Sequence, residues 1–254
     1  MTIAEKRQKA LDNVPKVYMQ GFSDGEKAEN DRFWDYIQNY GKRTGWEKGF
    51  YNWGGEFLRP KYKIAPESAS ARSSTFQGCP NLKIVESKYF DFSKCPRGTA
   101  DNQGWHYSFT TCSSLERVED IGICNAYSFN HTWAWCGKLH TIECIYPDKD
   151  TKFKNAFDYC SSLVHIRFGD GCVIGQDINF QWSPLSVESA MSAMNALYYF
   201  DTAHGEYSMH TIYFSDATKA LLDELGQFAF EFAPGEWIEG TWETAIAAKG
   251  WLAG

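Results

Sequence analysis

A short pattern of apolar residues returns at a fixed interval through the middle of this chain. Each copy reads aromatic-x-x-Cys-x-x-Leu-x-x-Ile/Val, where x is any residue. The four copies are Phe76, Cys79, Leu82 and Val85; Phe109, Cys112, Leu115 and Val118; Trp133, Cys136, Leu139 and Ile142; and Phe157, Cys160, Leu163 and Ile166. The last three copies begin 24 residues apart, and the first precedes the second by 33. A period of this length predicts a solenoid, in which a unit too small to bury its own apolar face stacks on similar neighbours.

The eight cysteines follow a second, shorter period. Five of them lie on a 12-residue grid, namely Cys112, Cys124, Cys136, Cys160 and Cys172. Cys79 and Cys95 fit the same grid once nine inserted residues are allowed between the first two copies, whereas Cys144 does not fit. Because a free cysteine behaves as a small hydrophobe, we expect inward-facing structural thiols, with oxidation of stacked neighbours as the alternative. No spacing of Cys and His typical of zinc sites occurs, so we expect no metal.

Copies such as Phe157-Asp-Tyr-Cys160-Ser-Ser-Leu163-Val-His-Ile166 resemble the BspA-like leucine-rich repeat, whose units carry an Ala-Phe-x-x-Cys-x-x-Leu-x-x-Ile core. The resemblance covers roughly residues 76 to 182. It implies an α+β solenoid that is short and right-handed, with one strand per unit and less regular backbone opposite. It also implies no catalytic residue and no cofactor, because members of this family are surface and interaction proteins, many of them from gut bacteria or their phages.

The charge balance and the composition limit the classes of function. The chain carries a net charge of −7, and its Lys and Arg residues are scattered. Because nucleic-acid affinity depends on clustered cations that displace counterions, we expect no nucleic-acid partner. Hydrophobic residues make up 43% of the sequence, which is enough for a core of some size. No run approaches the roughly 20 apolar residues of a bilayer-spanning helix, so we expect no membrane span.

Residues 1–45 are expected to be helical. One predicted helix begins at the capping box of Ser23 and Glu26 and ends at Gly41. Its apolar face is an aromatic stripe at helical spacing, formed by Phe33, Tyr36, Ile37 and Tyr40. Because so short a region cannot make a core of its own, we expect the stripe to pack on another surface. That surface is either the rest of the chain or a second copy of it, and in the second case the stripe would be an anchor or oligomerisation surface.

The remaining chain divides into three predicted parts. Residues 46–75 read as an irregular, aromatic-rich connector with turns at glycines and prolines. Residues 76–182 hold the repeat, and residues 183–254 form an α/β cap, which a solenoid needs to cover its last apolar layer. The elements expected in the cap are a helix over 187–199 capped by Ser186, a strand from His210 to Phe214, a helix capped by Ser215 or Asp216 and ending at Leu225, and a helix over 242–249 closed by Gly250.

Six residues are candidates for a binding surface, because exposed aromatic side chains give a large contact area at low entropic cost. They are Trp105, His106, Tyr107, Phe129, His131 and Trp135. The inserted loop near Arg97 to Trp105 would extend the same face. The alternative is that these aromatics only wedge irregular layers together.

Motifs that carry chemistry are absent from the sequence. It contains no Gly-rich phosphate loop, no Gly-x-Ser-x-Gly and no His-Glu-x-x-His. Asp148 and Asp150 lack the further ligands of a calcium loop, so we expect a solvated turn there. An enzyme would need a convergent cluster of ionisable groups, and the sequence supplies none. We therefore expect a protein without catalytic activity.

Two non-enzymatic hypotheses remain. The stretches Asp31-Arg-Phe-Trp-Asp-Tyr and Ser183-Pro-Leu-Ser-Val-Glu-Ser are similar to the ends of repeat proteins encoded in prophages of gut Firmicutes. This resemblance favours a structural protein of a phage virion, in the tail, baseplate or head, with N-terminal helices bound to other virion proteins or to copies of itself. Its repeat would then bind a protein or a glycan of the host surface. The alternative is a bacterial cell-surface or secreted adhesin of the same repeat class.

The two hypotheses imply different locations. The first residues carry positive charge but no apolar run behind them, which argues against a secretory signal. We therefore expect synthesis in the host cytoplasm and a final location in the virion. The adhesin would instead lie at the cell surface or outside the cell.

Overall fold

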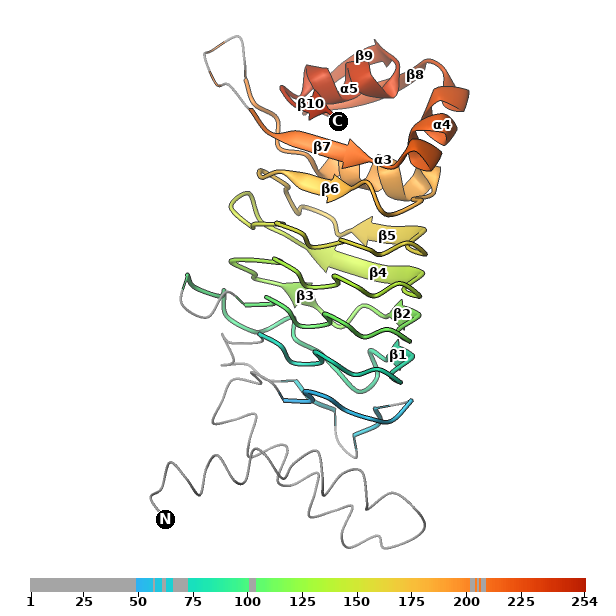
Figure 1. Cartoon of the computed structure of the whole chain (residues 1–254). Helices are drawn as coiled ribbons and strands as arrows, with labels where there is room; N and C mark the ends of the chain where they lie inside the picture. Colours follow the sequence, from blue (N-terminus) through green and yellow to red (C-terminus); the bar gives the residue numbers. More distant parts are fainter. Residues whose placement is uncertain are drawn as a thin grey trace, which may run out of the picture.

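The computed structural model of this protein describes residues 49–56, 58–60, 63–65, 73–100, 104–201, 204, 206 and 209–254. The described chain winds through layers stacked along one axis, and helices lie at the C-terminal end of the stack (Figure 1). The predicted N-terminal stripe of Phe33, Tyr36, Ile37 and Tyr40 lies outside the described residues.

Five short strands form a parallel sheet along one side of the stack. They are β1 (Ile84–Val85), β2 (Arg117–Val118), β3 (Ile123–Cys124), β4 (Thr141–Tyr146) and β5 (His165–Phe168). Val85 pairs with Val118, Val118 with Ile142, and Ile142 with Ile166. These four residues are the last position of each copy of the pattern, and all of them are buried. One period of the sequence therefore advances the chain by one layer.

The first position of the pattern forms a column of aromatic rings inside the stack. The column runs through Phe50, Phe76, Phe109, Trp133, Phe157, Phe180 and Phe214. Neighbouring ring centroids are 4.7 to 6.2 Å apart, and the rings are nearly parallel, at 3° to 29°. Phe50 comes from the predicted connector, and its backbone N–H donates to Thr75 O (2.7 Å). The layers thus begin earlier in the chain than the four copies of the pattern indicate.

The second position of the pattern places a thiol beside each ring. Cys79, Cys112, Cys136 and Cys160 are fully buried, and each Sγ donates to the backbone carbonyl of the aromatic residue one layer earlier. The Sγ to O distances are 2.9 to 3.1 Å. Each thiol therefore fills space in its own layer and joins that layer to the preceding one. None of the eight cysteines, all of which lie among the described residues, forms a disulfide bond.

The 12-residue grid is wrong for two of the cysteines. Cys124 and Cys172 are only half-buried, whereas Cys144, which does not fit the grid, is fully buried. The reason at Cys124 is the alternation of side chains along a strand, because its neighbour Ile123 already points into the core. In β4, Cys144 and Ile145 are both buried at an irregularity in the register between β4 and β5.

Helix α3 (Val187–Ala196) covers the exposed edge of β5. Ser186 caps it as predicted, by accepting from Ser189 N. The backbone N–H of Ile166 donates to Ser189 Oγ and that of Phe168 to Ser192 Oγ, both at 3.0 Å. The predicted helix extends to residue 199, but α3 ends at Ala196. The chain there pairs with another layer instead, because Ile174 N donates to Ala196 O (2.7 Å) and Ile174 pairs in parallel with Leu197.

Besides α3, the chain from Ile178 onward forms two further sheets and two helices. The elements are β6 (Ile178–Phe180), β7 (Thr211–Phe214), α4 (Asp216–Leu225), β8 (Phe228–Ala233), β9 (Glu236–Gly240), α5 (Trp242–Ala248) and β10 (Leu252–Ala253). Strands β6, β7 and β10 are parallel in the order β10-β7-β6, and β8 and β9 form an antiparallel hairpin. Ser215, not Asp216, caps α4. The hairpin is not among the elements predicted from the sequence, although alternating phenylalanines in β8 and a turn at Gly235 are typical of one.

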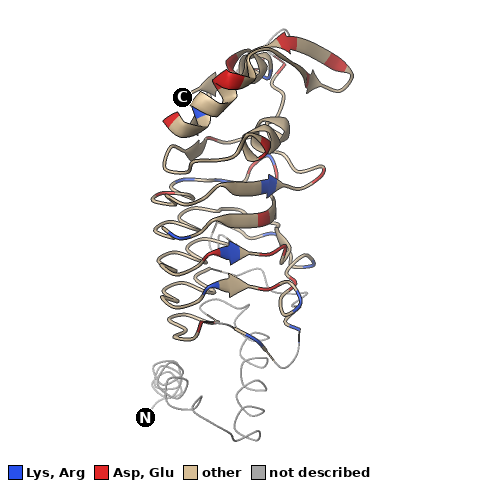
Figure 2. Ribbon diagram, turned by 90° about the vertical axis from the view of Figure 1, so that its right-hand side faces the viewer, with Lys and Arg blue, Asp and Glu red and all other residues tan. Residues whose placement is uncertain are grey.

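Charged side chains are interspersed along the described stack, and neither sign is gathered on one face of it (Figure 2). The β8–β9 hairpin carries three glutamates, Glu231, Glu236 and Glu239. The longest described helices have ten residues, and none in the described part of the chain combines the length and apolarity that a bilayer crossing requires.

Candidate binding surface

The turns that carry Phe76, Phe109, Trp133 and Phe157 have a left-handed residue on both sides of the inward ring. Two positions after the ring, the left-handed residues are Asn52, Gly78, Thr111, Trp135 and Tyr159, with φ between 57° and 72°. Two positions before it, they are Ser74, Tyr107, His131 and Asn155, with φ between 53° and 58°. Asn and Gly tolerate this conformation, whereas other residues lose roughly 1 to 2 kcal/mol in it. The turns therefore hold bulky aromatic side chains where the backbone disfavours them.

Four aromatic residues of these turns and Trp182 form a line of rings on the outside of the stack, which we call the aromatic ladder. The ladder consists of Tyr107, His131, Trp135, Tyr159 and Trp182. Successive centroids are 4.9, 6.3, 5.8 and 4.7 Å apart, with interplanar angles of 4° to 23°. Trp135, Tyr159 and Trp182 are 46%, 48% and 43% exposed, and Tyr107 and His131 are half-buried. The ladder is thus a continuous line of rings that reaches solvent.

Four of the six predicted surface residues meet at the start of this ladder. Tyr107, His131 and Trp135 belong to it, and the His106 ring lies 4.0 Å from that of Tyr107. Trp105 was expected at the surface, but it is fully buried. It packs between Phe92 and Phe109, and its indole N–H donates to Cys124 O (3.1 Å).

Phe129 is the second wrong prediction. Its ring is fully buried between Trp133 and Phe153, at 5.6 and 5.5 Å. Both errors have one cause. The half of each layer away from the column of inward rings also needs bulky inward side chains, and Trp105 and Phe129 supply them.

Tyr159 and Trp182 are not among the surface residues predicted from the sequence. Each stands two residues after an inward ring, Phe157 and Phe180 respectively, which is the position that Trp135 takes after its own ring. The same repeat that predicted the interior could therefore have predicted the outward line.

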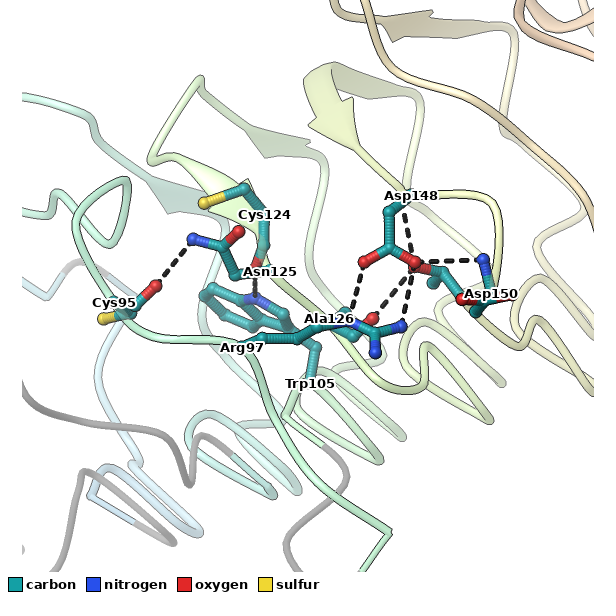
Figure 3. A network of polar contacts seen from close by, with 9 residues as sticks. Cys95, Arg97, Trp105, Cys124, Asn125, Ala126, Asp148 and Asp150 are labelled. Carbon is teal, nitrogen blue, oxygen red and sulfur yellow. Dashed lines mark hydrogen bonds and ion pairs between the residues drawn. The ribbon is translucent and has the colours of Figure 1, made fainter. Parts of the chain in front are cut away.

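The inserted segment near Arg97 lies against other turns of the stack (Figure 3). The Arg97 guanidinium donates to both carboxylate oxygens of Asp148, at 2.7 and 2.9 Å. Asp148 Oδ1 also accepts from the backbone N–H of Asp150 (3.0 Å) and from Thr151 Oγ1 (3.1 Å). Asp148 is therefore more than a solvated turn residue, because it anchors the insertion 51 positions away in the sequence.

The electrostatics keep the histidines of this surface uncharged at neutral pH. Burial, and then the nearby His131, lowers the pKa of His106 below its ordinary value. Burial also lowers the pKa of His131, although the Asp158 carboxylate opposes this shift. The Nδ1 atom of His131 is buried without a hydrogen-bond partner. The start of the ladder thus presents neutral rings rather than cations.

Comparison of the chain with protein-family models, with curated proteins and with solved structures finds no match.

Proposed function

We propose that this chain is a non-enzymatic binding protein, with the layers of a short BspA-like leucine-rich repeat, that holds the aromatic ladder out to a partner. The observation that carries the proposal is the line of three half-exposed rings at Trp135, Tyr159 and Trp182. Aromatic side chains of this kind are the usual anchors of binding surfaces, because they offer large area at little entropic cost.

The support beneath the ladder suits this role. Backbone N–H groups of the turns donate from layer to layer, for example Trp135 N to Asp158 O (2.8 Å) and His131 N to Lys154 O (3.0 Å). The inward rings of the same turns also stack from layer to layer. The side chains of the ladder are therefore held in place before a partner arrives, which lowers the entropic cost of binding.

We further propose that the protein belongs to a phage virion, with its N-terminal region bound to other virion proteins or to copies of itself. This part rests on the resemblance of the repeat and of both chain ends to prophage-encoded proteins. A cell-surface or secreted adhesin is the competing assignment.

Mass spectrometry of purified virions tests the location. The particles come from a host strain that carries this gene, and its cell-envelope and culture fractions serve as controls. We expect peptides of this chain in the particle fraction at a ratio to the other particle proteins that stays constant through a density gradient. Absence from particles together with presence in the envelope or culture fraction would assign the protein as an adhesin.

Adsorption of the purified protein to host cells tests the binding role. We expect saturable adsorption that is lost when Trp135 and Tyr159 are replaced together. Adsorption that the replacement leaves unchanged would remove the ladder from the proposed function.

A further inference from the structure

We propose that the aromatic ladder is a binding site for an extended, uncharged carbohydrate chain. The inference rests on the proposed binding function and names the chemical class of its partner. It follows from the shape of the ladder, its area, its charge and the backbone beneath it.

The shape of the ladder fits a linear ligand. Three of its rings, Trp135, Tyr159 and Trp182, form a single file along the stack axis, with one ring per layer. The spacings of 5.8 and 4.7 Å are comparable with the length of one sugar unit in an extended chain. A ligand that repeats along its own length could therefore meet an equivalent contact at every layer.

The area of the ladder is too small for a stable protein interface of its own. Large aromatic side chains bury about 150 to 250 Å² each when fully covered, so three rings that are nearly half exposed offer on the order of 300 Å². A stable protein interface takes about 800 Å² from each partner. Oligosaccharides need less area, since a few stacked rings and hydrogen bonds hold them.

The chemistry of the surface favours an uncharged ligand. Because neighbouring rings of the ladder stack on one another, they turn mainly their edges and their indole N–H and phenol O–H groups to solvent, and these groups can hydrogen-bond to the hydroxyl groups of a pyranose. The exposed indoles of Trp135 and Trp182 bring N–H donors, and Ser161 and Gln181 place neutral polar side chains in the exposed turns of Tyr159 and Trp182. Burial, with a smaller effect of the nearby Lys154, lowers the pKa of His131 against the opposing Asp158, so this ring itself brings no charge to the ligand at neutral pH.

The backbone makes bulky rings costly at these turn positions, and Thr111 carries the same cost at the equivalent position of the preceding layer, with a φ of 62°. Trp135 and Tyr159 hold φ angles of 61° and 57°, at the position where Asn52 and Gly78 stand in other layers. Asn or Gly there would avoid the strain of a left-handed aromatic residue. Strained residues of this kind cluster at ligand sites, where the surrounding structure holds them in place.

The same backbone supplies variants that should fold. Trp135→Gly and Tyr159→Asn each install a residue type that already occupies the equivalent turn in another layer. We expect the circular dichroism spectrum and the unfolding midpoint of the double variant to stay close to those of the parent protein. Trp237→Ser, at a tryptophan that is 63% exposed on β9 and far from the ladder in sequence, is the matched control.

The binding experiment uses the full chain and three linear uncharged hexasaccharides, cellohexaose, maltohexaose and chitohexaose, with their monosaccharides as controls. Isothermal titration calorimetry and intrinsic tryptophan fluorescence report binding. We expect at least one hexasaccharide to bind saturably and more tightly than its monosaccharide. The Trp135→Gly and Tyr159→Asn double variant should lose at least tenfold in affinity, and Trp237→Ser should bind like the parent protein.

Two results would overturn the inference. One is the failure of all three hexasaccharides to bind the parent protein, and the other is undiminished binding by the folded double variant. If the sugars fail while adsorption to host cells still depends on the ladder, the proposed binding function stands and its partner is a protein.

Discussion

At the scale of single residues, the cysteines of the pattern each do two things. Their side chains fill the space between inward rings, and their thiols donate to a carbonyl one layer away, as Cys136 does to Phe109 O at 3.0 Å. Burial raises the pKa of Cys160 to about 12, which keeps its thiol protonated and able to donate. A small hydrophobe that also donates a weak hydrogen bond suits this position better than Ala or Val.

Replacement of Cys136 by alanine should destabilise the protein. The variant leaves a small cavity and removes one donor to Phe109 O, so we expect the free energy of unfolding to fall by about 1 to 3 kcal/mol. Urea unfolding followed by circular dichroism measures the change. Cys172→Ala is the control, because Cys172 is half-buried and its loss should matter less. Equal stability of Cys136→Ala and the parent protein would show that the thiol has no structural role.

At the scale of elements, α3 takes the place of a further strand. An exposed edge of a parallel sheet presents unpaired N–H groups to solvent or to other chains. Here the hydroxyl groups of Ser189 and Ser192 accept from the edge N–H groups of β5, and Ser186 N donates to Val164 O (2.9 Å). The helix therefore ends the sheet without leaving the described edge open.

Removal of the Ser189 hydroxyl should be costly for this reason. Ser189→Ala leaves the buried N–H of Ile166 without its acceptor, and we expect a loss of about 1 to 3 kcal/mol in unfolding free energy. Thermal and urea unfolding provide the measurement. Ser113→Ala, at an exposed serine, should change stability by less than about 0.5 kcal/mol. A loss no larger than that of the control would mean that solvent or another group satisfies Ile166 N.

At the scale of the whole molecule, a buried lysine joins the last helix to the stack. Lys249, at the end of α5, is 5% exposed, and its Nζ donates to Asn195 O (2.7 Å) and Leu197 O (3.0 Å). These carbonyls lie where α3 ends, at the negative end of the helix dipole. Burial nevertheless lowers the pKa of Lys249 from 10.5 to about 8.

The stability of the protein should therefore depend on Lys249 above neutral pH. Between pH 8 and 10.5 the unfolded chain still binds the proton that the folded chain has released, so stability rises with pH across this window. The gain amounts to up to about 3 kcal/mol. We expect the unfolding free energy of the parent protein, relative to Lys249→Met, to be larger at pH 10 than at pH 7. A difference that stays constant or falls with pH would contradict the lowered pKa.

The candidate surface shows how far sequence reasoning reaches. Trp135 was predicted because it follows an inward Trp133 by two residues, and the same rule applied to Phe157 and Phe180 gives Tyr159 and Trp182. The prediction was wrong at Trp105 and Phe129, because an aromatic residue between copies of the pattern looks the same in the sequence whether its side chain fills the core or reaches solvent. Only contacts with Phe92 and Phe153 distinguish the two cases.

Local patterns suffice to predict which positions of each copy face inward and where Ser186 begins a helix, because apolar spacing and capping act within a few residues of chain. Which outward rings become neighbours depends on contacts between layers of the folded chain. Tyr159 lies beside Trp135 and Trp182 only because successive layers keep their register, and that register is set by hydrogen bonds and packing between residues about two dozen positions apart.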